Sequence, residues 1–173
     1  VIYRWFDMSQ INVDTINEKT TGNGVNIPGH VLQVKRFETS EHVTVTTGSS
    51  WEDVYTALGS ITPVSTDSKI LAIANISCYV GGSDGNSRAT LRFSRNGTGL
   101  DANTGYVGFT GSNPSAPMVN LGMTLLDTPS TTSSVNYGIQ VNIGTSGTPG
   151  YQFSYDDANG EQISELVLME IGG

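Results

Sequence analysis

Histidine, the side chain best suited to acid–base chemistry near neutral pH, occurs twice in this sequence, as His30 and His42. Neither residue belongs to a metal-ligand spacing motif, and neither adjoins a serine or cysteine nucleophile signature. A packed or solvated structural role is therefore the better interpretation of both histidines.

Carboxylates are more numerous, and several lie close together near the end of the chain, at Asp156, Asp157, Glu161 and Glu165. A pair of them could serve glycoside hydrolysis, but neighbouring acids are common in the loops of an acidic protein. The run Ser83–Asn86 offers oxygen ligands without the spacing of a calcium-binding loop, so it predicts a turn. We therefore expect no catalytic residue, no metal site and no cofactor, and we expect that the protein is not an enzyme.

A single cysteine, Cys78, excludes an intrachain disulfide. It lies within an apolar run and has no cationic neighbour in the sequence that would stabilise a thiolate. We expect Cys78 to pack as a small hydrophobic side chain inside a strand.

Length and composition indicate one all-β domain. The chain has 173 residues, 36% of them hydrophobic, with 21 glycines and only 8 lysines and arginines. Short strands joined by turns suit this composition better than helices do. The net charge of −8 makes a nucleic-acid partner improbable. The longest apolar run of the chain, Ile70–Val80, is interrupted by Asn75 and Ser77 and is too short to span a membrane. We therefore also expect no membrane insertion.

Alternation of apolar and polar residues predicts about eight to ten strands, the number typical of an antiparallel β-sandwich or jelly roll. Asn96–Gly97 is a strong hairpin-turn signal. The segment Ser50–Gly59 begins like a helix, and a single turn or an irregular strand are both compatible with it. The expected strands lie within residues 30–37, 42–47, 66–80, 89–99, 118–128, 135–143, 151–155 and 165–171.

Two segments have apolar residues that one sandwich does not account for. In Ile70–Val80 both alternating faces are partly apolar, which predicts cover on both. The stretch Val13–Val34 is polar and rich in turn residues, with too few apolar side chains to fold by itself. Both features favour an assembly. Either Leu71, Ile73 and Tyr79, or the opposite set of Ile70, Ile76 and Val80, would then face the partner chains.

Five blocks, taken in order, resemble the recurring segments of bacteriophage tail-fibre and virion-fibre tip domains. They are "GHVLQV", "TDSKILAI", "RFSRNG", "LLDTPSTTSSVNYGIQV" and "LVLMEIGG", and they span residues 29–173. The ordered set is far more specific than any single block. The chain departs from the pattern at Lys35–Arg36, directly after the first block, and at Gly138.

The resemblance implies a domain division and an assembly. Residues 1–29 would form an N-terminal connector and a short shaft-like segment in which three chains intertwine, and residues 30–173 would form the sandwich tip. The partners implied are two further copies of the chain, an upstream fibre or virion protein held through the N-terminus, and a glycan of the host surface. The location implied is the virion, in a tail fibre or another surface fibre.

The function implied is non-enzymatic attachment of a trimeric fibre tip to the host cell, through saccharide. The alternative is a structural virion component, such as a head fibre or capsid decoration protein, without a dedicated receptor, because fold does not fix function. Thr98–Pro117 resembles a binding loop, since its aromatic residues stand among short polar ones, although alternation equally allows a core strand there. The candidate receptor-binding residues are Tyr106, Phe109, Asn103, Asp101 and Tyr155.

Overall fold

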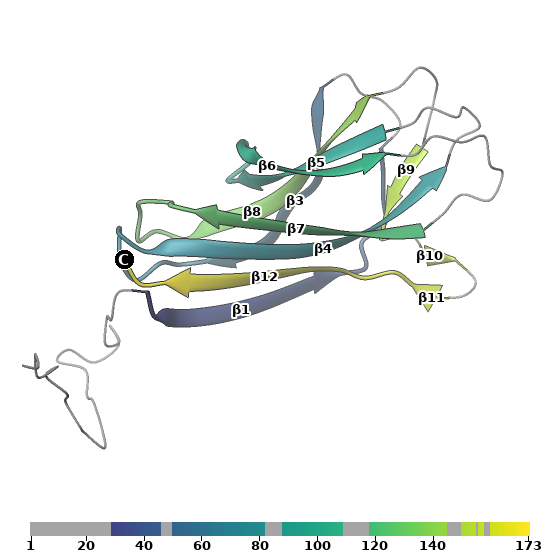
Figure 1. Ribbon diagram of the computed structural model, residues 1–173. Helices are drawn as coiled ribbons and strands as arrows, with labels where there is room; N and C mark the ends of the chain where they lie inside the picture. Colours follow the sequence, from purple (N-terminus) through teal and green to yellow (C-terminus); the bar gives the residue numbers. More distant parts are fainter. Residues whose placement is uncertain are drawn as a thin grey trace, which may run out of the picture.

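The computed structural model describes residues 29–45, 50–81, 88–108, 118–144, 150–154, 156–157 and 160–173. The expected connector and shaft, residues 1–28, lie outside this set. Over the described residues the chain forms strands without any helix, which confirms the all-β prediction (Figure 1). The strands are β1 (Val31–Thr39), β2 (Val43–Val45), β3 (Trp51–Ile61), β4 (Lys69–Gly81), β5 (Arg88–Arg95), β6 (Thr98–Gly108), β7 (Met118–Asp127), β8 (Val135–Gly144), β9 (Gly150–Phe153), β10 (Asp156–Asp157), β11 (Gly160–Glu161) and β12 (Ser164–Ile171).

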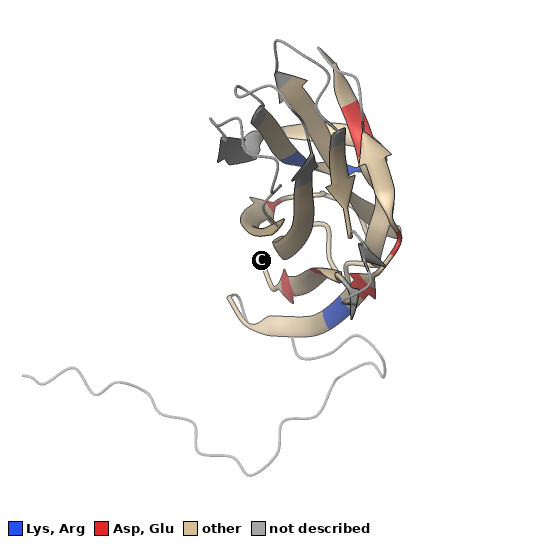
Figure 2. Cartoon of the chain, turned by 90° about the vertical axis from the view of Figure 1, so that its right-hand side faces the viewer, with Lys and Arg blue, Asp and Glu red and all other residues tan. Residues whose placement is uncertain are grey.

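Two antiparallel sheets pack face to face, an arrangement consistent with a β-sandwich (Figure 2). Sheet A has six strands, in the order β1-β12-β4-β9-β2 with β7 also paired to β4, and sheet B has the order β3-β8-β5-β6. The short strands β10 and β11 form a separate ribbon. The jelly-roll connectivity and the intertwined shaft stay predictions.

The core lies between the two sheets and is lined by alternate residues of their strands. On β4, Ile70, Ala72, Ala74, Ile76 and Cys78 are all at most 1% exposed. On β8 of the facing sheet the buried apolar residues are Val135, Tyr137, Ile139, Val141 and Ile143, and the sequence placed the last four of them on one face of the strand. One of the two sets proposed to face partner chains therefore fills the core of the single chain, through Ile70 and Ile76.

Strand β4 organises sheet A because it is hydrogen-bonded along both edges. One edge pairs with β7 over ten residues, from Ile70 opposite Asp127 to Tyr79 opposite Met118. The other edge pairs first with β12, up to Asn75, and then with β9, from Cys78 onward. Sheet A therefore branches at residues 76 and 77 of β4.

Serine side chains fill the branch point with hydrogen bonds. The amide of Ser77 donates to Ser164 Oγ at 3.1 Å, and the Ser77 carbonyl accepts from the amide of Ser154 at 3.1 Å. Ser154 Oγ donates to Ser164 Oγ at 2.9 Å, and Tyr55 Oη on β3 lies 2.7 Å from Ser154 Oγ. The backbone groups that the branch leaves without strand partners are thus satisfied, and a residue of sheet B is tied to the same point.

The β5–β6 hairpin forms where the sequence placed it. Asn96 and Gly97 both have positive φ, 51° and 79°, as a two-residue turn of type I′ requires. The amide of Asn136 on β8 donates to Asn96 Oδ1 at 2.9 Å, which ties the turn to the neighbouring strand. This local signal was sufficient to fix the connection.

The segment Ser50–Gly59, for which the sequence left a turn or an irregular strand open, lies in strand β3, and the strand is irregular. Its register against β8 shifts between Asp53 and Tyr55 and again between Tyr55 and Gly59. The second shift lies over Gly138, where a methyl group would be 2.2 Å from the Tyr55 carbonyl oxygen. Gly138 thus makes room for the bulged strand beside it.

We expect Gly138→Ala to lower the melting temperature by several degrees, because overpacking of this kind costs about 1–3 kcal/mol and each kcal/mol is worth roughly 2–4 °C in a chain of this size. Gly122→Ala is the matched control, because a methyl group there meets nothing within 4 Å. Thermal unfolding followed by circular dichroism measures both. Equal melting temperatures for the two variants would contradict the packing argument.

Candidate functional site

Three of the five candidate receptor residues, Asp101, Asn103 and Tyr106, lie within strand β6, at the edge of sheet B. The sequence left a binding loop and a core strand both open for this stretch, and the structure forms a strand over residues 98–108 that contains these three residues. Their side chains, together with Phe109 and Tyr155, lie outside the described part of the chain. The structure therefore gives these residues a backbone position and leaves their role as a prediction.

A cluster on the outer face of sheet B lies beside this strand, and we call it the Trp51 cluster: Trp51, Asp53, Arg92 and Gln140. The Arg92 guanidinium lies over the Trp51 ring, 4.1 Å from its centroid, and Arg92 Nε donates to Gln140 Oε1 at 2.9 Å. Gln140 Nε2 donates in turn to Asp53 Oδ1 at 2.9 Å. A cation, an aromatic ring, a carboxylate and an amide are thus held together on one sheet surface.

Strand register links this cluster to one of the predicted residues. Trp51 is opposite Asn142, Asn142 is opposite Thr90, and Thr90 is opposite Tyr106, so all four occupy one row across sheet B. Half-exposed aromatic rings beside hydrogen-bonding side chains are the usual features of a surface that binds sugar rings. Sequence reasoning missed Trp51 and Arg92 because they approach each other only when β3, β8 and β5 are aligned.

A cavity of about 400 Å³ lies between β1 and β3 and is lined by Glu38, Glu41 and Tyr55, among others. Tyr55 Oη donates to the Glu41 carbonyl at 3.3 Å and lies 2.7 Å from Ser154 Oγ, and burial raises the pKa of its phenol. The two glutamates are exposed at the rim. The described lining contains no nucleophile with an adjacent base, so the cavity gives no basis for a reaction.

Of the other groups considered for chemistry, Asp156 lies opposite Glu161 in the β10–β11 ribbon, and the side chains of both lie outside the described part of the chain. His30 and His42 are exposed, and Glu165 is paired at the surface with Arg36, their nearest atoms 2.7 Å apart. Within the described ranges, no group of three His, Cys, Asp or Glu side chains could hold a metal ion. Cys78 is buried as predicted, and burial raises the pKa of its thiol to about 12, so it is a poor nucleophile. Within those ranges there is no helix long and apolar enough to cross a membrane.

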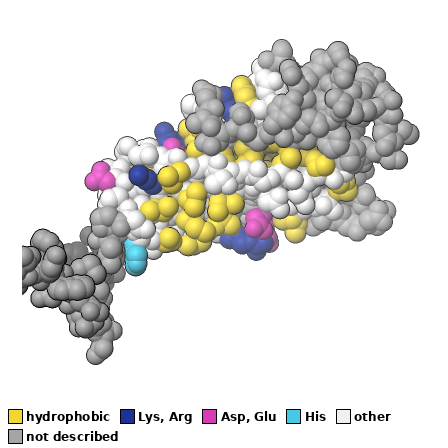
Figure 3. Space-filling model, viewed as in Figure 1, with side chains coloured by type: hydrophobic (Ala, Val, Ile, Leu, Met, Phe, Trp, Pro, Cys, Tyr) yellow, Lys and Arg dark blue, Asp and Glu magenta, His cyan; other side chains and the backbone are white. Residues whose placement is uncertain are grey.

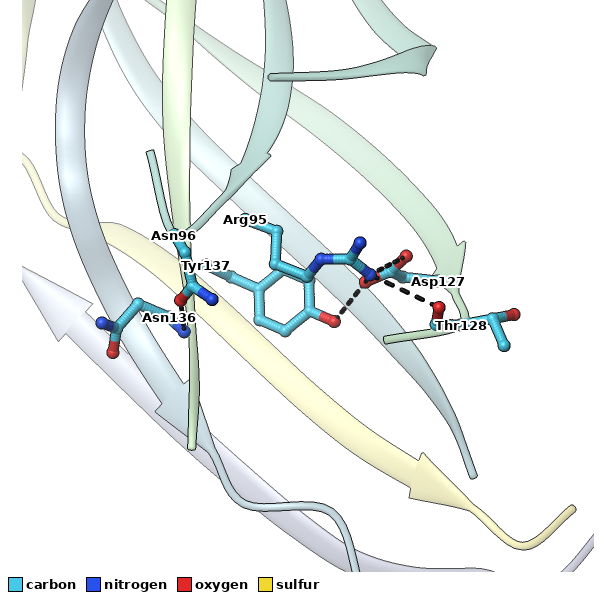
Figure 4. Close-up of polar contacts among 6 residues, drawn as sticks. All are labelled: Arg95, Asn96, Asp127, Thr128, Asn136 and Tyr137. Carbon is cyan, nitrogen blue, oxygen red and sulfur yellow. Dashed lines mark hydrogen bonds and ion pairs between the residues drawn. The ribbon is translucent and has the colours of Figure 1, made fainter. Parts of the chain in front are cut away.

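Asp127, at the end of β7, is an ionisable group that accepts hydrogen bonds from two strands of sheet B (Figure 4). Arg95 Nη1, from β5, donates to both of its carboxylate oxygens at 2.9 and 2.8 Å, and Tyr137 Oη, from β8, donates to Oδ2 at 2.6 Å. These contacts join sheet B to sheet A. Burial, the hydrogen bond to Asp127 and the charge of that carboxylate together raise the pKa of Tyr137. The residues satisfy one another, so we interpret the cluster as a structural link.

Because the folded chain holds the Tyr137 proton more tightly than the unfolded chain, the free energy of unfolding should be unchanged well below pH 10 and fall as pH rises above about 10, the usual tyrosine pKa. Tyr137→Phe removes a hydrogen-bond donor to the charged Asp127 carboxylate and should lower the free energy of unfolding by about 1.5–3 kcal/mol near neutral pH. Above pH 10 the free energy of unfolding of this variant should fall less steeply than that of the unmodified protein. Circular dichroism and tyrosinate absorbance, recorded against pH, measure this. An unchanged alkaline loss in the variant would contradict it.

Comparison with known proteins gives only weak similarities. No protein-family model matches the chain, and no curated protein sequence matches it. Among solved structures, one of infectious bursal disease virus Gt strain is similar over 97% of this chain and 45% of that one, with 12% identity and a TM-score of 0.38. The tripod (BppUct-A-L) from the baseplate of bacteriophage Tuc2009 is similar over 95% and 83% of the two chains, with 12% identity and a TM-score of 0.37. Dimeric latent PorU from Porphyromonas gingivalis covers 85% of this chain and 14% of that one, at 7% identity and a TM-score of 0.37. At such TM-scores these similarities carry no argument about fold or function.

Proposed function

We propose that this chain is the trimeric tip domain of a virion fibre, which attaches the particle to its host through cell-surface saccharide without catalysis. The observation that carries the proposal is the way in which the family-like blocks meet in the fold. "GHVLQV" forms the start of β1 and "LVLMEIGG" the end of β12, and these strands pair along their length. "TDSKILAI" in β4 then pairs with β12 on one edge and with the start of the "LLDTP" block, in β7, on the other.

Side-chain contacts reinforce this relation between distant blocks. Gln33, in the first block, donates through Nε2 to Glu170 Oε2, in the last block, at 2.5 Å. Glu170 is fully buried, and its other oxygen accepts from the Val64 amide at 2.7 Å. The amide of Gly29 donates to the Gly172 carbonyl at 2.7 Å, and the amide of Gly172 donates to the His30 carbonyl at 2.8 Å. The first, second and last blocks and the start of the fourth thus meet in sheet A although they are distant in sequence, whereas the third block lies in sheet B. The meeting of these four supports reading them as one signature.

Sheet B is the better candidate for the receptor surface. Its outer face carries the Trp51 cluster, and Tyr106 occupies the same strand row as Trp51. Stacking on the Trp51 ring combined with bonds from Asp53 and Arg92, which Gln140 holds in position, is the chemistry that a neutral or acidic sugar would need. The proposal assigns recognition to this face and no bond breaking.

We expect gold-labelled antibodies against this chain to mark the tip of a fibre on intact virions of the phage that encodes it, because the proposed function requires the domain at the outer end of a fibre. Electron microscopy of negatively stained particles reads the position. Uniform labelling over the capsid shell would contradict the proposal and favour the alternative, a capsid decoration protein.

We expect Tyr106→Ala and Phe109→Ala each to weaken binding to host cells by about 1–3 kcal/mol, because each removes a ring that would stack on a sugar, while the circular dichroism spectrum is unchanged. Thr44→Ala, at an exposed position of β2, is the control. Labelled protein titrated onto cells measures binding, and reducing ends in the medium measure hydrolysis. Loss of folding would show that the aromatic residues belong to the core, and release of sugar would contradict the absence of catalysis.

A further inference from the structure

Sheet A carries apolar side chains on the face that points away from sheet B, and we call this set the outer apolar face: Leu71, Ile73, Leu126, Met169, Val34 and Val167. Register places Leu126, Leu71, Met169 and Val34 in one row across β7, β4, β12 and β1. Ile73 and Val167 stand side by side in the next row. Figure 3 shows hydrophobic side chains gathered over these strands, on the side facing the viewer.

Three of these side chains are exposed in the single chain, and Leu71, Val167 and Met169 are half-buried. Val34 is 57% exposed, Leu126 54% and Ile73 39%, although Ile70, Ala72 and Ala74 on the opposite side of β4 are fully buried. Sheet B cannot cover the outer face, because it packs against the other side of sheet A. A contiguous apolar surface that spans four strands is uncommon on a monomeric soluble protein and marks an interaction site.

Charges beside this face favour a second copy of the chain as its occupant. Arg36 lies opposite Val167 in the second row and contacts Glu165 at 2.7 Å and Glu38 at 3.0 Å, and Lys69 lies on β4 one row beyond Leu71. Two cations and two carboxylates therefore border the face, whereas the whole chain has a net charge of −8. Copies can meet here without the repulsion that their overall charge imposes, and each can offer Arg36 to the carboxylates of its neighbour.

The outer face of sheet B is unsuited to the same role. Its central positions are the charged and amide side chains of Asp53, Arg92 and Gln140, which already bond one another. Subunit interfaces that are permanent resemble a divided hydrophobic core, and the described side chains of β3, β8 and β5 on this face do not form one. Of the two sheets, only sheet A therefore presents a surface of the right chemistry among its described residues.

We propose that the outer apolar face is the subunit interface, where three copies pack around a three-fold axis with Leu71 and Ile73 nearest that axis. The number three rests on the proposed function, whereas the choice of face rests on burial and register. The residues before Gly29 would then leave all three copies at the same end of the assembly, because Gly29 is bonded to Gly172 beside the first row. The set of Leu71 and Ile73 is thereby selected over the buried set of Ile70 and Ile76.

Cross-linking tests the face directly. Cys78 is buried, so Ile73→Cys introduces a thiol that a short bismaleimide can reach without native background. Ala57→Cys, at an exposed position of β3 in sheet B, is the matched control. Two thiols that face each other across an interface have an effective concentration on the order of mM. At micromolar protein, Ile73→Cys should therefore give at least about tenfold more covalent dimer than Ala57→Cys, and the yield from Ile73→Cys should not change when the protein is diluted.

A charge at the same position gives a second measurement. Ile73→Asp would place three carboxylates together and should leave monomers or aggregates in sedimentation velocity, while Ala57→Asp should sediment as the unmodified protein does. A trimer that persists in Ile73→Asp, or equal cross-linking at both positions, would overturn the interface and leave the fibre-tip proposal standing. If the unmodified protein is a folded monomer and antibodies against it still mark fibre tips, the proposed interface is also wrong. Residues 1–28 of the same chain would then be the remaining candidate to cover the outer apolar face.

Discussion

Strand β4 is the element on which the rest of the structure depends, because it is apolar on both faces and hydrogen-bonded along both edges. Its inner residues, from Ile70 to Cys78, form the centre of the core. Its edges hold β7 on one side and β12 and β9 on the other, so every strand of sheet A is reached through it. In a two-layer sandwich the second sheet covers only one face of such a strand. The other apolar face of β4 is therefore uncovered, and it is part of the outer apolar face of sheet A.

Polar links fix how the two sheets sit on each other. At one place Asp127 of sheet A receives hydrogen bonds from Arg95 and Tyr137 of sheet B. At another, the serines of the branch point contact Tyr55 of β3. Hydrophobic burial alone would tolerate some sliding of one sheet over the other, whereas bonds with defined partners do not. The outer faces are therefore presented in one fixed arrangement, as an assembly or a receptor site requires.

Much of the fold was predictable from local sequence signals. Alternation located β1, β4, β5, β7, β8 and β12, and Asn96–Gly97 located the hairpin, because both signals depend on neighbouring residues alone. The irregular strand β3 was left open, since its bulge depends on Gly138, which is far away in the sequence. The branch in sheet A could not be predicted either, because it also depends on residues that are far apart in the sequence. It depends on Ser154 and Ser164 meeting Ser77 in space.

The functional surfaces were predictable to a smaller extent. The sequence identified β4 as a strand that needs cover on both faces but could not choose between Leu71 with Ile73 and Ile70 with Ile76. Only the position of sheet B decides which set is inside. It pointed to Tyr106 from composition but left a loop and a strand both open for that residue, and it missed Trp51 and Arg92, which are brought together by strand pairing.

The central claim is that one chain cannot cover its own apolar surface, and the mass of the unmodified protein in solution tests it most directly. Sedimentation equilibrium over a range of micromolar concentrations should give three times the 18.3 kDa of the single chain, with no dissociation on dilution. A folded, soluble species of 18.3 kDa over the same range would contradict the account.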